Sequence, residues 1–216
     1  MHIIKGGVCA AKGFTANGIH CGIRKNRTKR DLALIFSECP ASAAAVYTQN
    51  LVKGAPLLVT KKHLLNGKAQ AVICNSGNAN TCNANGIEIA DGMSALAAKA
   101  LHISEDDIIV ASTGVIGQPL SLDPIAAAIT PLASGLSASG GALAAEAIMT
   151  TDTTVKEIAV EFTVNGKLCR MGGIAKGSGM IHPNMATMLV FITTDCAIHP
   201  TMLQKALSSD IQNTFN

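Results

Sequence analysis

Aromatic residues are scarce in this chain: they make up 3% of its 216 residues, with no Trp and a single Tyr. So few rings offer no platform on which single-stranded nucleic acid could stack, and we expect no nucleic-acid partner. Charged residues are also few, at 14%, whereas hydrophobic residues reach 48%. A chain this apolar is not disordered, and its core must be built from aliphatic side chains.

No charge of one sign dominates the sequence. The net charge is +3, and one basic cluster stands out, formed by Arg24, Lys25, Arg27, Lys29 and Arg30. Such a cluster can contact an anionic polymer, but a charge run is more typical of a solvated turn between two strands, which is our interpretation.

Targeting and membrane-spanning signals are missing from this sequence. The first residues show no charged region followed by a long apolar one, and no apolar run reaches the roughly 18–20 residues of a membrane span. The seven cysteines contain no C-x-x-C pair. They predict reduced, mostly buried thiols, with neither a disulfide framework nor a metal site. We therefore expect a cytoplasmic protein that does not contact a membrane.

Several familiar catalytic motifs are absent too. Ser178 lies in GSG, which lacks the spacing of a G-x-S-x-G nucleophile elbow, and the chain has no phosphate-binding or dinucleotide-binding glycine loop. His182 and His199 each precede a proline and have no partner at metal-ligand spacing. We interpret both as loop histidines.

Hydrophobic periodicity predicts a single α/β domain over residues 1–216. Apolar runs and alternation predict strands at 31–37, 43–48, 71–74, 107–111, 158–164, 167–171 and 187–194. The last run is nearly continuous, so we expect a central strand covered on both faces. Spacing of three or four predicts helices at about 56–65, 86–101, 121–134, 141–149 and after Pro200. The chain stops directly after this last apolar helix, so we expect it to be part of a longer protein.

Two predicted strands run straight into small polar residues. Asn75–Asn80 reads NSGNAN and follows the strand at 71–74, and Ser112–Gly117 reads STGVIG and follows the strand at 107–111. Such segments are either binding loops at a sheet edge or plain turns in which Asn side chains bond to the backbone. The sequence leaves both interpretations open.

The junction Ala186-Thr187 separates a glycine-rich polar loop from an apolar run. A Thr hydroxyl is a weak nucleophile that needs a base, and the residue's own α-amine, with a pKa of about 7.7–8, can serve once the preceding peptide bond is cut. The same hydroxyl can make that cut by attacking the preceding carbonyl. A Thr that merely opens an apolar strand is, however, very common.

Four separated blocks carry a family resemblance: NSGNAN, ASTGVIG, AIMTTDT and KGSGMIHPNMATMLVFITTD, in this order from Asn75 to Asp195. Together with residues 31–56 they resemble the ornithine acetyltransferase family, the glutamate N-acetyltransferases of arginine biosynthesis. The resemblance implies an α/β/β/α sandwich with two stacked mixed sheets. Pattern alone leaves a mixed three-layer sheet open.

The resemblance also implies the site residues and the reaction. The precursor is expected to cut itself between Ala186 and Thr187. This leaves an α-chain segment, residues 1–186, and a β-chain segment of which residues 187–216 are the start. Thr187 is expected to be the nucleophile, Thr113 and Gly114 the oxyanion hole, and Thr153 and Lys176 substrate contacts. His182 receives no role.

The implied reaction moves an acetyl group from N2-acetylornithine to glutamate through an acetyl-enzyme. It needs no cofactor and no metal, and acetyl-CoA remains open as a second donor. The implied partners are the remainder of the β chain, in a heterotetramer of two α and two β chains. Two alternatives stay open: a self-cleaving aminopeptidase or amidohydrolase of similar fold, and a non-catalytic small-molecule-binding subunit.

Overall fold

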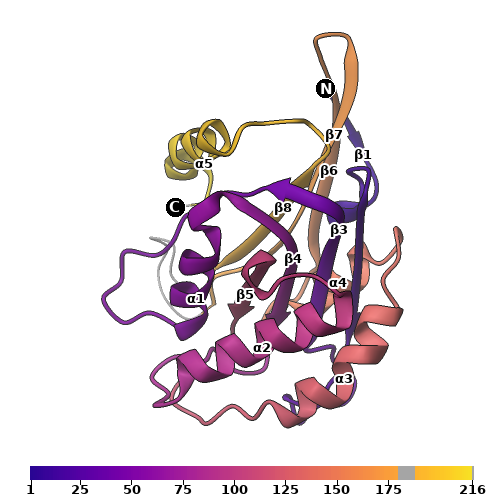
Figure 1. The fold of residues 1–216 in the computed structure, drawn as a ribbon. Coiled ribbons are helices and arrows are strands. Elements are labelled where there is room, and N and C mark those ends of the chain that lie inside the picture. Colours follow the sequence, from indigo (N-terminus) through magenta and orange to yellow (C-terminus); the bar gives the residue numbers. More distant parts are fainter. Residues whose placement is uncertain (180–187, 216) are drawn as a thin grey trace.

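Two stacked four-stranded sheets form the centre of the molecule. The structure is a computed structural model that describes residues 1–179 and 188–215 (Figure 1). One sheet has the order β2-β3-β4-β5 and consists of β2 (Phe14–Ile19), β3 (Leu32–Ser42), β4 (Lys68–Asn75) and β5 (Ile108–Ser112). The other has the order β1-β6-β7-β8 and consists of β1 (His2–Ile4), β6 (Lys156–Val164), β7 (Lys167–Lys176) and β8 (Leu189–Thr194).

Three helices pack on the outer face of the β2–β5 sheet: α1 (Ala55–His63), α2 (Gly86–Leu101) and α3 (Asp123–Ser134) (Figure 1). Leu32 and Leu34 of β3 point toward these helices, whereas Ala33 and Ile35 point toward the other sheet. Both faces of β3 are therefore buried in its first half, which explains the continuous apolar run there, whereas Glu38, Cys39 and Pro40 are exposed.

The short Ala-rich helix α4 (Gly141–Ala147) belongs to the core between the two sheets. Ala144 and Ala145 pack there with Ala33 of β3 and Ile174 of β7. Their small side chains let the helix approach the strands closely. Three 3₁₀ turns complete the described elements: Gly7–Cys9, Leu64–Asn66 and Glu105–Asp107.

Most of the predicted elements are confirmed. Helix α2 spans the predicted 86–101, and the hairpin of β6 and β7 turns at Asn165-Gly166 and projects from the rest of the molecule (Figure 1). Pro56 lies in the first turn of α1, and Gly67, with φ +68°, follows the 3₁₀ turn that ends this segment.

Two predicted strands are wrong in whole or in part. Residues 43–48 form no strand: β3 instead continues to Ser42 through an irregularity after Phe36 and pairs with β2 and β4. The run at 187–194 is a strand only from Leu189 in the described residues. There β8 lies at an edge of its sheet, with Ile192 48% exposed, so it is not central.

The two stacked sheets are confirmed, with two differences in detail. The β2–β5 sheet is mixed, because β4 and β5 run parallel, whereas all described pairs of the other sheet are antiparallel. The outer face of that second sheet exposes Ile3, Ile158 and Ile192, so the described residues supply no helical layer there.

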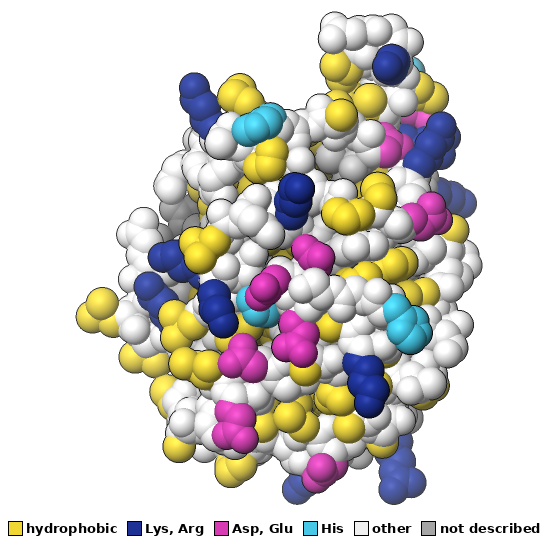
Figure 2. All heavy atoms as spheres, viewed as in Figure 1, with side chains coloured by type: hydrophobic (Ala, Val, Ile, Leu, Met, Phe, Trp, Pro, Cys, Tyr) yellow, Lys and Arg dark blue, Asp and Glu magenta, His cyan; other side chains and the backbone are white. Residues whose placement is uncertain are grey.

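The seven cysteines are free, but the prediction that most are buried is wrong. Only Cys74 and Cys169 are buried, Cys39 and Cys82 are exposed, and the other three are half-buried. Within the described ranges, no helix is both long and apolar enough to cross a membrane. The surface view shows acidic, basic and apolar side chains interspersed on one face (Figure 2).

The last helix, α5 (Pro200–Thr214), follows β8 through an extended connection and lies near the C-terminus at the upper left of the view (Figure 1). Its predicted amphipathic pattern is only partly used, because Ile211 alone is buried among its described apolar residues. Leu203 and Leu207 are half-buried and line a large open cavity.

Candidate active site

The site begins at the carboxyl ends of β4 and β5. These strands are parallel neighbours that pair Asn75 with Ser112, so the segments that follow them leave the sheet side by side. The Thr113 amide donates to the Asn75 carbonyl (2.9 Å), and the Ala79 amide donates to the Val115 carbonyl (2.8 Å). Ligands in α/β sheets bind at such strand ends, so both segments are well placed for function.

Gly114 is required where the two segments cross. Its φ of +126° disfavours any residue with a side chain, and an added Cβ would lie 2.5 Å from the Gly77 carbonyl carbon and 2.7 Å from the Asn78 amide nitrogen. The position of the Gly114 amide is therefore fixed by direct backbone packing against Gly77-Asn78.

Asn side chains hold the first segment in shape. The Asn75 carboxamide oxygen accepts from the amides of Gly77 (3.2 Å) and Asn78 (3.0 Å), and that of Asn78 accepts from the Asn80 amide (2.8 Å). The side-chain NH₂ group of Asn75 donates to the Ser112 hydroxyl (2.6 Å), and this bond links the two segments. The turn interpretation of Asn75–Asn80 is thus confirmed, and its use as a binding loop stays a prediction.

Two donors at this crossing are not used by the protein. Within the described residues, neither the Thr113 hydroxyl nor the Gly114 amide has a hydrogen-bond partner. Thr113 is only 7% exposed, and both residues line the large cavity. Unpaired donors in a mostly buried position are costly unless a ligand or a reacting group accepts from them.

A second pair of segments meets at the end of β7. The Asp152 carboxylate, whose side chain is 3% exposed, accepts from the Gly177 amide (2.7 Å), the Thr150 amide (3.1 Å) and the Lys156 ammonium (2.6 Å). Burial alone would raise the pKa of Asp152, but these hydrogen bonds outweigh it and lower the pKa to about 2. A permanently ionised Asp152 therefore fixes the TTDT segment against the residue after Lys176.

Lys176 is a buried cation at the last position of β7. It is 2% exposed, and its ammonium donates to the Gly177 carbonyl (2.7 Å). Burial lowers its pKa, although the nearby Asp152 opposes this shift. A buried ammonium that borders the cavity is suited to meet the carboxylate of an amino-acid ligand.

One cavity of about 2460 Å³ connects these parts. Its lining includes Thr113, Gly114 and Lys176, and also Gly179 and Met188, the described residues on either side of 180–187. The predicted nucleophile Thr187, its neighbour Ala186 and the loop residue His182 lie outside the described residues. The structure thus brings together three of the predicted site residues.

Thr153 is the predicted site residue that does not join this group. It is exposed and does not line the cavity, whereas Thr150 and Thr151 of the same TTDT segment do. His199 is an exposed loop residue whose ring accepts from the Thr201 amide at the start of α5, as a loop histidine would.

Sequence reasoning missed three residues of this region: Arg24 lines the cavity, and Asn75 and Asp152 hold the segments that border it. Asp152 was recognisable as the one carboxylate among clustered hydroxyls, and Asn75 by its place at a strand end. Arg24 carries no such signal, because in the sequence it is one of five similar cations. The cluster does lie between β2 and β3, and Lys25, Arg27 and Lys29 are exposed, but Arg24 is half-buried.

The fold is shared with proteins of very different sequence. The L-aminopeptidase D-Ala-esterase/amidase of Ochrobactrum anthropi, a described variant of the Ntn hydrolase fold, superposes with a TM-score of 0.53 at 13% identity, over 100% of this chain and 71% of that chain. A Pyrococcus horikoshii protein superposes with a TM-score of 0.60 at 11% identity, over 95% of this chain and 68% of that one. At such identities the likeness defines the fold class alone.

Closer relatives define the family. The ArgJ family pattern matches residues 15–216. The Arginine biosynthesis bifunctional protein ArgJ of Caldanaerobacter subterraneus is 48% identical over 100% of this chain and 53% of its own length, and that of Listeria monocytogenes is 49% identical over 100% and 54%. This chain belongs to the ArgJ family, and it spans about half the length of these curated relatives.

Solved structures of this family agree with the fold. ArgJ from Bacillus halodurans has a TM-score of 0.78 at 46% identity, over 86% of this chain and 98% of that chain. The ornithine acetyltransferase of Mycobacterium tuberculosis, solved in complex with ornithine, has a TM-score of 0.75 at 36% identity, over 84% and 97%.

Proposed function

We propose that this chain is part of an acetyltransferase that moves the acetyl group of N2-acetylornithine to glutamate. The observation that carries the proposal is the pair of unused donors, the Thr113 hydroxyl and the Gly114 amide, at a cavity that is also lined by both flanks of residues 180–187. Two such donors suit the oxyanion of a tetrahedral intermediate. The nucleophile we assign is Thr187.

The active nucleophile forms by self-cleavage. The Thr187 hydroxyl attacks the Ala186 carbonyl, the C–N bond breaks, and the nitrogen takes the proton as the acyl group moves to oxygen. Water then hydrolyses the ester, which leaves an Ala186 carboxylate and a free α-amine on Thr187. This amine is the base for the same residue's hydroxyl.

Transfer follows in two half-reactions. The Thr187 hydroxyl attacks the acetyl carbonyl of N2-acetylornithine, and ornithine leaves after its nitrogen takes a proton from the Thr187 amine. The amine of glutamate then attacks the acetyl ester and restores the hydroxyl. Each half passes through an oxyanion, which the donors of Thr113 and Gly114 stabilise. Lys176 pairs with the α-carboxylate that both substrates share.

The comparisons support parts of this proposal. A family relative is solved with ornithine, the product of the first half-reaction. In addition, the superposition on the solved Bacillus halodurans chain covers 86% of the 216 residues, about 186 residues, and 98% of that solved chain. The solved chain is therefore only about half as long as the curated family members. A chain of that length is the product expected from cleavage at Ala186-Thr187.

The first experiment tests cleavage. Intact mass spectrometry of the full-length protein should find a fragment that begins at Thr187, and Thr187→Ala should leave a single uncut chain without transferase activity. Normal cleavage of the Thr187→Ala protein would refute self-attack by this residue. The mass also tests the division into an α-chain segment 1–186 and a β-chain segment whose first part is 187–216.

The second experiment separates transfer from hydrolysis. The cleaved protein is incubated with N2-acetylornithine, with and without glutamate, and the products are separated by chromatography. Acetylglutamate supports the proposal, whereas free acetate irrespective of glutamate supports the alternative of an aminopeptidase or amidohydrolase. Binding without any turnover supports a non-catalytic subunit. Replacing acetylornithine with acetyl-CoA tests whether acetyl-CoA is a second donor. The proposed chemistry requires no cofactor.

A further inference from the structure

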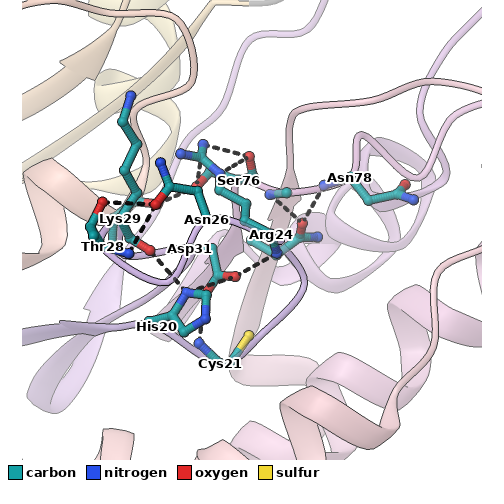
Figure 3. Close-up of polar contacts among 12 residues, drawn as sticks. His20, Cys21, Arg24, Asn26, Thr28, Lys29, Asp31, Ser76 and Asn78 are labelled. Carbon is teal, nitrogen blue, oxygen red and sulfur yellow. Dashed lines mark hydrogen bonds and ion pairs between the residues drawn. The ribbon is translucent and has the colours of Figure 1, made fainter.

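Arg24 differs from the other cations of its cluster in what it contacts. Its Nε and Nη2 donate to the Ser76 carbonyl (3.0 and 2.7 Å), and Nη2 also donates to the Ser76 hydroxyl (3.0 Å) and to the Met149 carbonyl. Figure 3 shows the guanidinium turned toward Ser76. One side chain therefore joins the segment after β4 to the segment after α4.

Arg24 is itself held by a buried carboxylate. Asp31 is 0% exposed, and its two oxygens accept from the amides of Cys21 (2.6 Å) and Arg24 (2.8 Å) (Figure 3). The Asp31 carbonyl accepts from the Ser76 amide (2.9 Å). The backbone that carries Arg24 and the backbone that it binds are thus fixed to the same residue.

Both partners of Arg24 directly precede residues of the site. Ser76 precedes Gly77-Asn78, the backbone against which Gly114 packs, and Met149 precedes Thr150, which lines the cavity. The Ser76 hydroxyl donates to the Ala147 carbonyl, which adds a second link between the same two segments. Movement of Ser76 would therefore shift the surface that sets the position of the Gly114 amide.

We propose that Arg24 is a positioning residue for the oxyanion site: its guanidinium clamps Ser76 to Met149, and this holds the Gly77-Asn78 backbone against Gly114. The inference rests on the proposed function of Thr113 and Gly114. Arg24 also lines the cavity, but its hydrogen bonds go to protein carbonyls and a hydroxyl, so the role we assign to it acts through the backbone.

Arginine chemistry explains why this position needs a guanidinium. Its planar fork donates in several fixed directions at once, whereas a lysine ammonium is a compact charge on a flexible stem. Arg24→Lys keeps the charge but cannot bridge two carbonyls of separate segments in the same geometry. The substitution therefore distinguishes the effect of the two-segment hydrogen bonding from the effect of the positive charge.

The chain offers a matched control in Arg30. It lies in the same loop and is also half-buried, but its Nε donates to the Glu146 carboxylate (3.0 Å) and its Nη1 to the Gly18 carbonyl (2.8 Å), neither of them in the turns of the site. Arg30→Lys removes a comparable guanidinium, so it reports the general cost of such a change.

The test uses the full-length protein with Arg24→Lys or Arg30→Lys. Hydrogen exchange followed by mass spectrometry is measured on peptides that cover 75–81 and 112–117, and kcat and KM are measured for acetyl transfer. Arg24→Lys should speed exchange in both peptides and lower kcat about 10- to 100-fold, because small misplacement at a reacting centre is that costly. KM should stay within about threefold, and Arg30→Lys should change neither readout.

Each other outcome overturns the inference. Unchanged exchange in Arg24→Lys means that there is no clamp, and faster exchange with unchanged kcat means that the clamp does not serve the reaction. A raised KM at unchanged kcat makes Arg24 a substrate ligand, and equal effects of Arg30→Lys indicate a general loss of stability. If the unsubstituted protein transfers no acetyl group, the proposed function fails separately, and exchange alone still decides whether Arg24 holds the turn.

Discussion

At the scale of single residues, the site combines donors that the fold leaves unused with charges that the fold pairs completely. Thr113 and Gly114 offer a hydroxyl and an amide to the cavity. Asp152, in contrast, has its carboxylate engaged by two amides and an ammonium. The first arrangement suits the developing negative charge of the proposed reaction, and the second fixes the segments beside it.

The hydroxyl of Thr113 gives the first residue-level prediction. Thr113→Val should leave the fold intact and lower kcat about 10²- to 10³-fold, as expected for removal of one oxyanion donor. Thr113→Ser, which keeps the hydroxyl, should retain most of the activity. Steady-state kinetics on both variants checks this, and equal rates for Val and Ser would remove Thr113 from the oxyanion site.

The Asp152 carboxylate gives a prediction about pH. Its folded pKa of about 2 lies below the ordinary value, so its ionised form stabilises the fold above about pH 4, and this contribution is lost as pH falls through about 2. Asp152→Asn should therefore lower the free energy of unfolding by about 1–2 kcal/mol at pH 7 and by less at pH 3. The figure for pH 7 is kept small because solvent screens the ion pair with Lys156, whose side chain is 47% exposed.

Urea unfolding at the two pH values measures this difference. Asp106→Asn is the control, because the Asp106 side chain is 72% exposed and its loss should have little effect at either pH. A cost of Asp152→Asn that is equal at pH 7 and pH 3 would contradict a pairing that depends on ionisation.

At the scale of elements, α4 approaches the β2–β5 sheet closely just before the chain enters the TTDT segment. An added Cβ at Gly18 of β2 would lie 2.1 Å from the Leu143 carbonyl oxygen of α4 and 2.8 Å from the Ala147 Cβ. Helix and strand are thus in contact through backbone atoms, with no room for a side chain at Gly18.

This contact predicts the effect of a single methyl group. Gly18→Ala must push α4 away and should destabilise the protein by about 1–3 kcal/mol, the usual cost of overpacking. Gly173→Ala is the matched control, because its added Cβ would lie 3.3 Å or more from its nearest neighbours. Urea midpoints measure both, and a Gly18→Ala midpoint equal to that of Gly173→Ala would contradict the close packing.

At the scale of the whole molecule, the described chain leaves much apolar surface uncovered. The cavity of about 2460 Å³ exceeds the roughly 300–1,000 Å³ of a typical small-ligand site. Its lining includes Leu203 and Leu207 of α5 and Phe191 of the edge strand β8. Since the chain spans about half the length of its relatives, we expect the remaining half to fill most of this space.

Co-expression tests this expectation. The 1–216 chain alone should bind the dye ANS, which reports exposed apolar surface, and its fluorescence should fall when the remaining half is co-expressed. Undiminished ANS binding in the purified complex would show that the cavity is not covered in this way. Native mass spectrometry of the cleaved full-length protein tests the expected two α and two β chains.

Much of the element order was predictable because its signals are local. The spacing of Ile87, Ala90, Met93 and Ala97 predicts α2, and Asn165-Gly166 between alternating strands predicts the β6–β7 hairpin, since both depend on neighbours in the chain. Residues 43–48 were mistaken for a strand because an apolar segment that lines a cavity has the same composition as one that pairs in a sheet.

The site was predictable only in its list of residues. The blocks NSGNAN, STG and KGSG pointed to Thr113, Gly114 and Lys176, and all three line one cavity. Their spatial relation depends on the parallel pairing of β4 with β5 and on the stacking of the two sheets, which involve residues far apart in the sequence. Local pattern does not encode such distances.

The sequence by itself thus determined most of the helices and strands, and which residue types can carry acyl transfer, because periodicity and side-chain chemistry are properties of the chain. Only the tertiary structure decided that Arg24 is a clamp while Lys25 is a solvated cation, that Thr150 and Thr151 rather than Thr153 face the cavity, and that β8 is an edge strand. The physical reason is that burial and hydrogen-bond partners, which set what a side chain does, arise only when distant segments pack together.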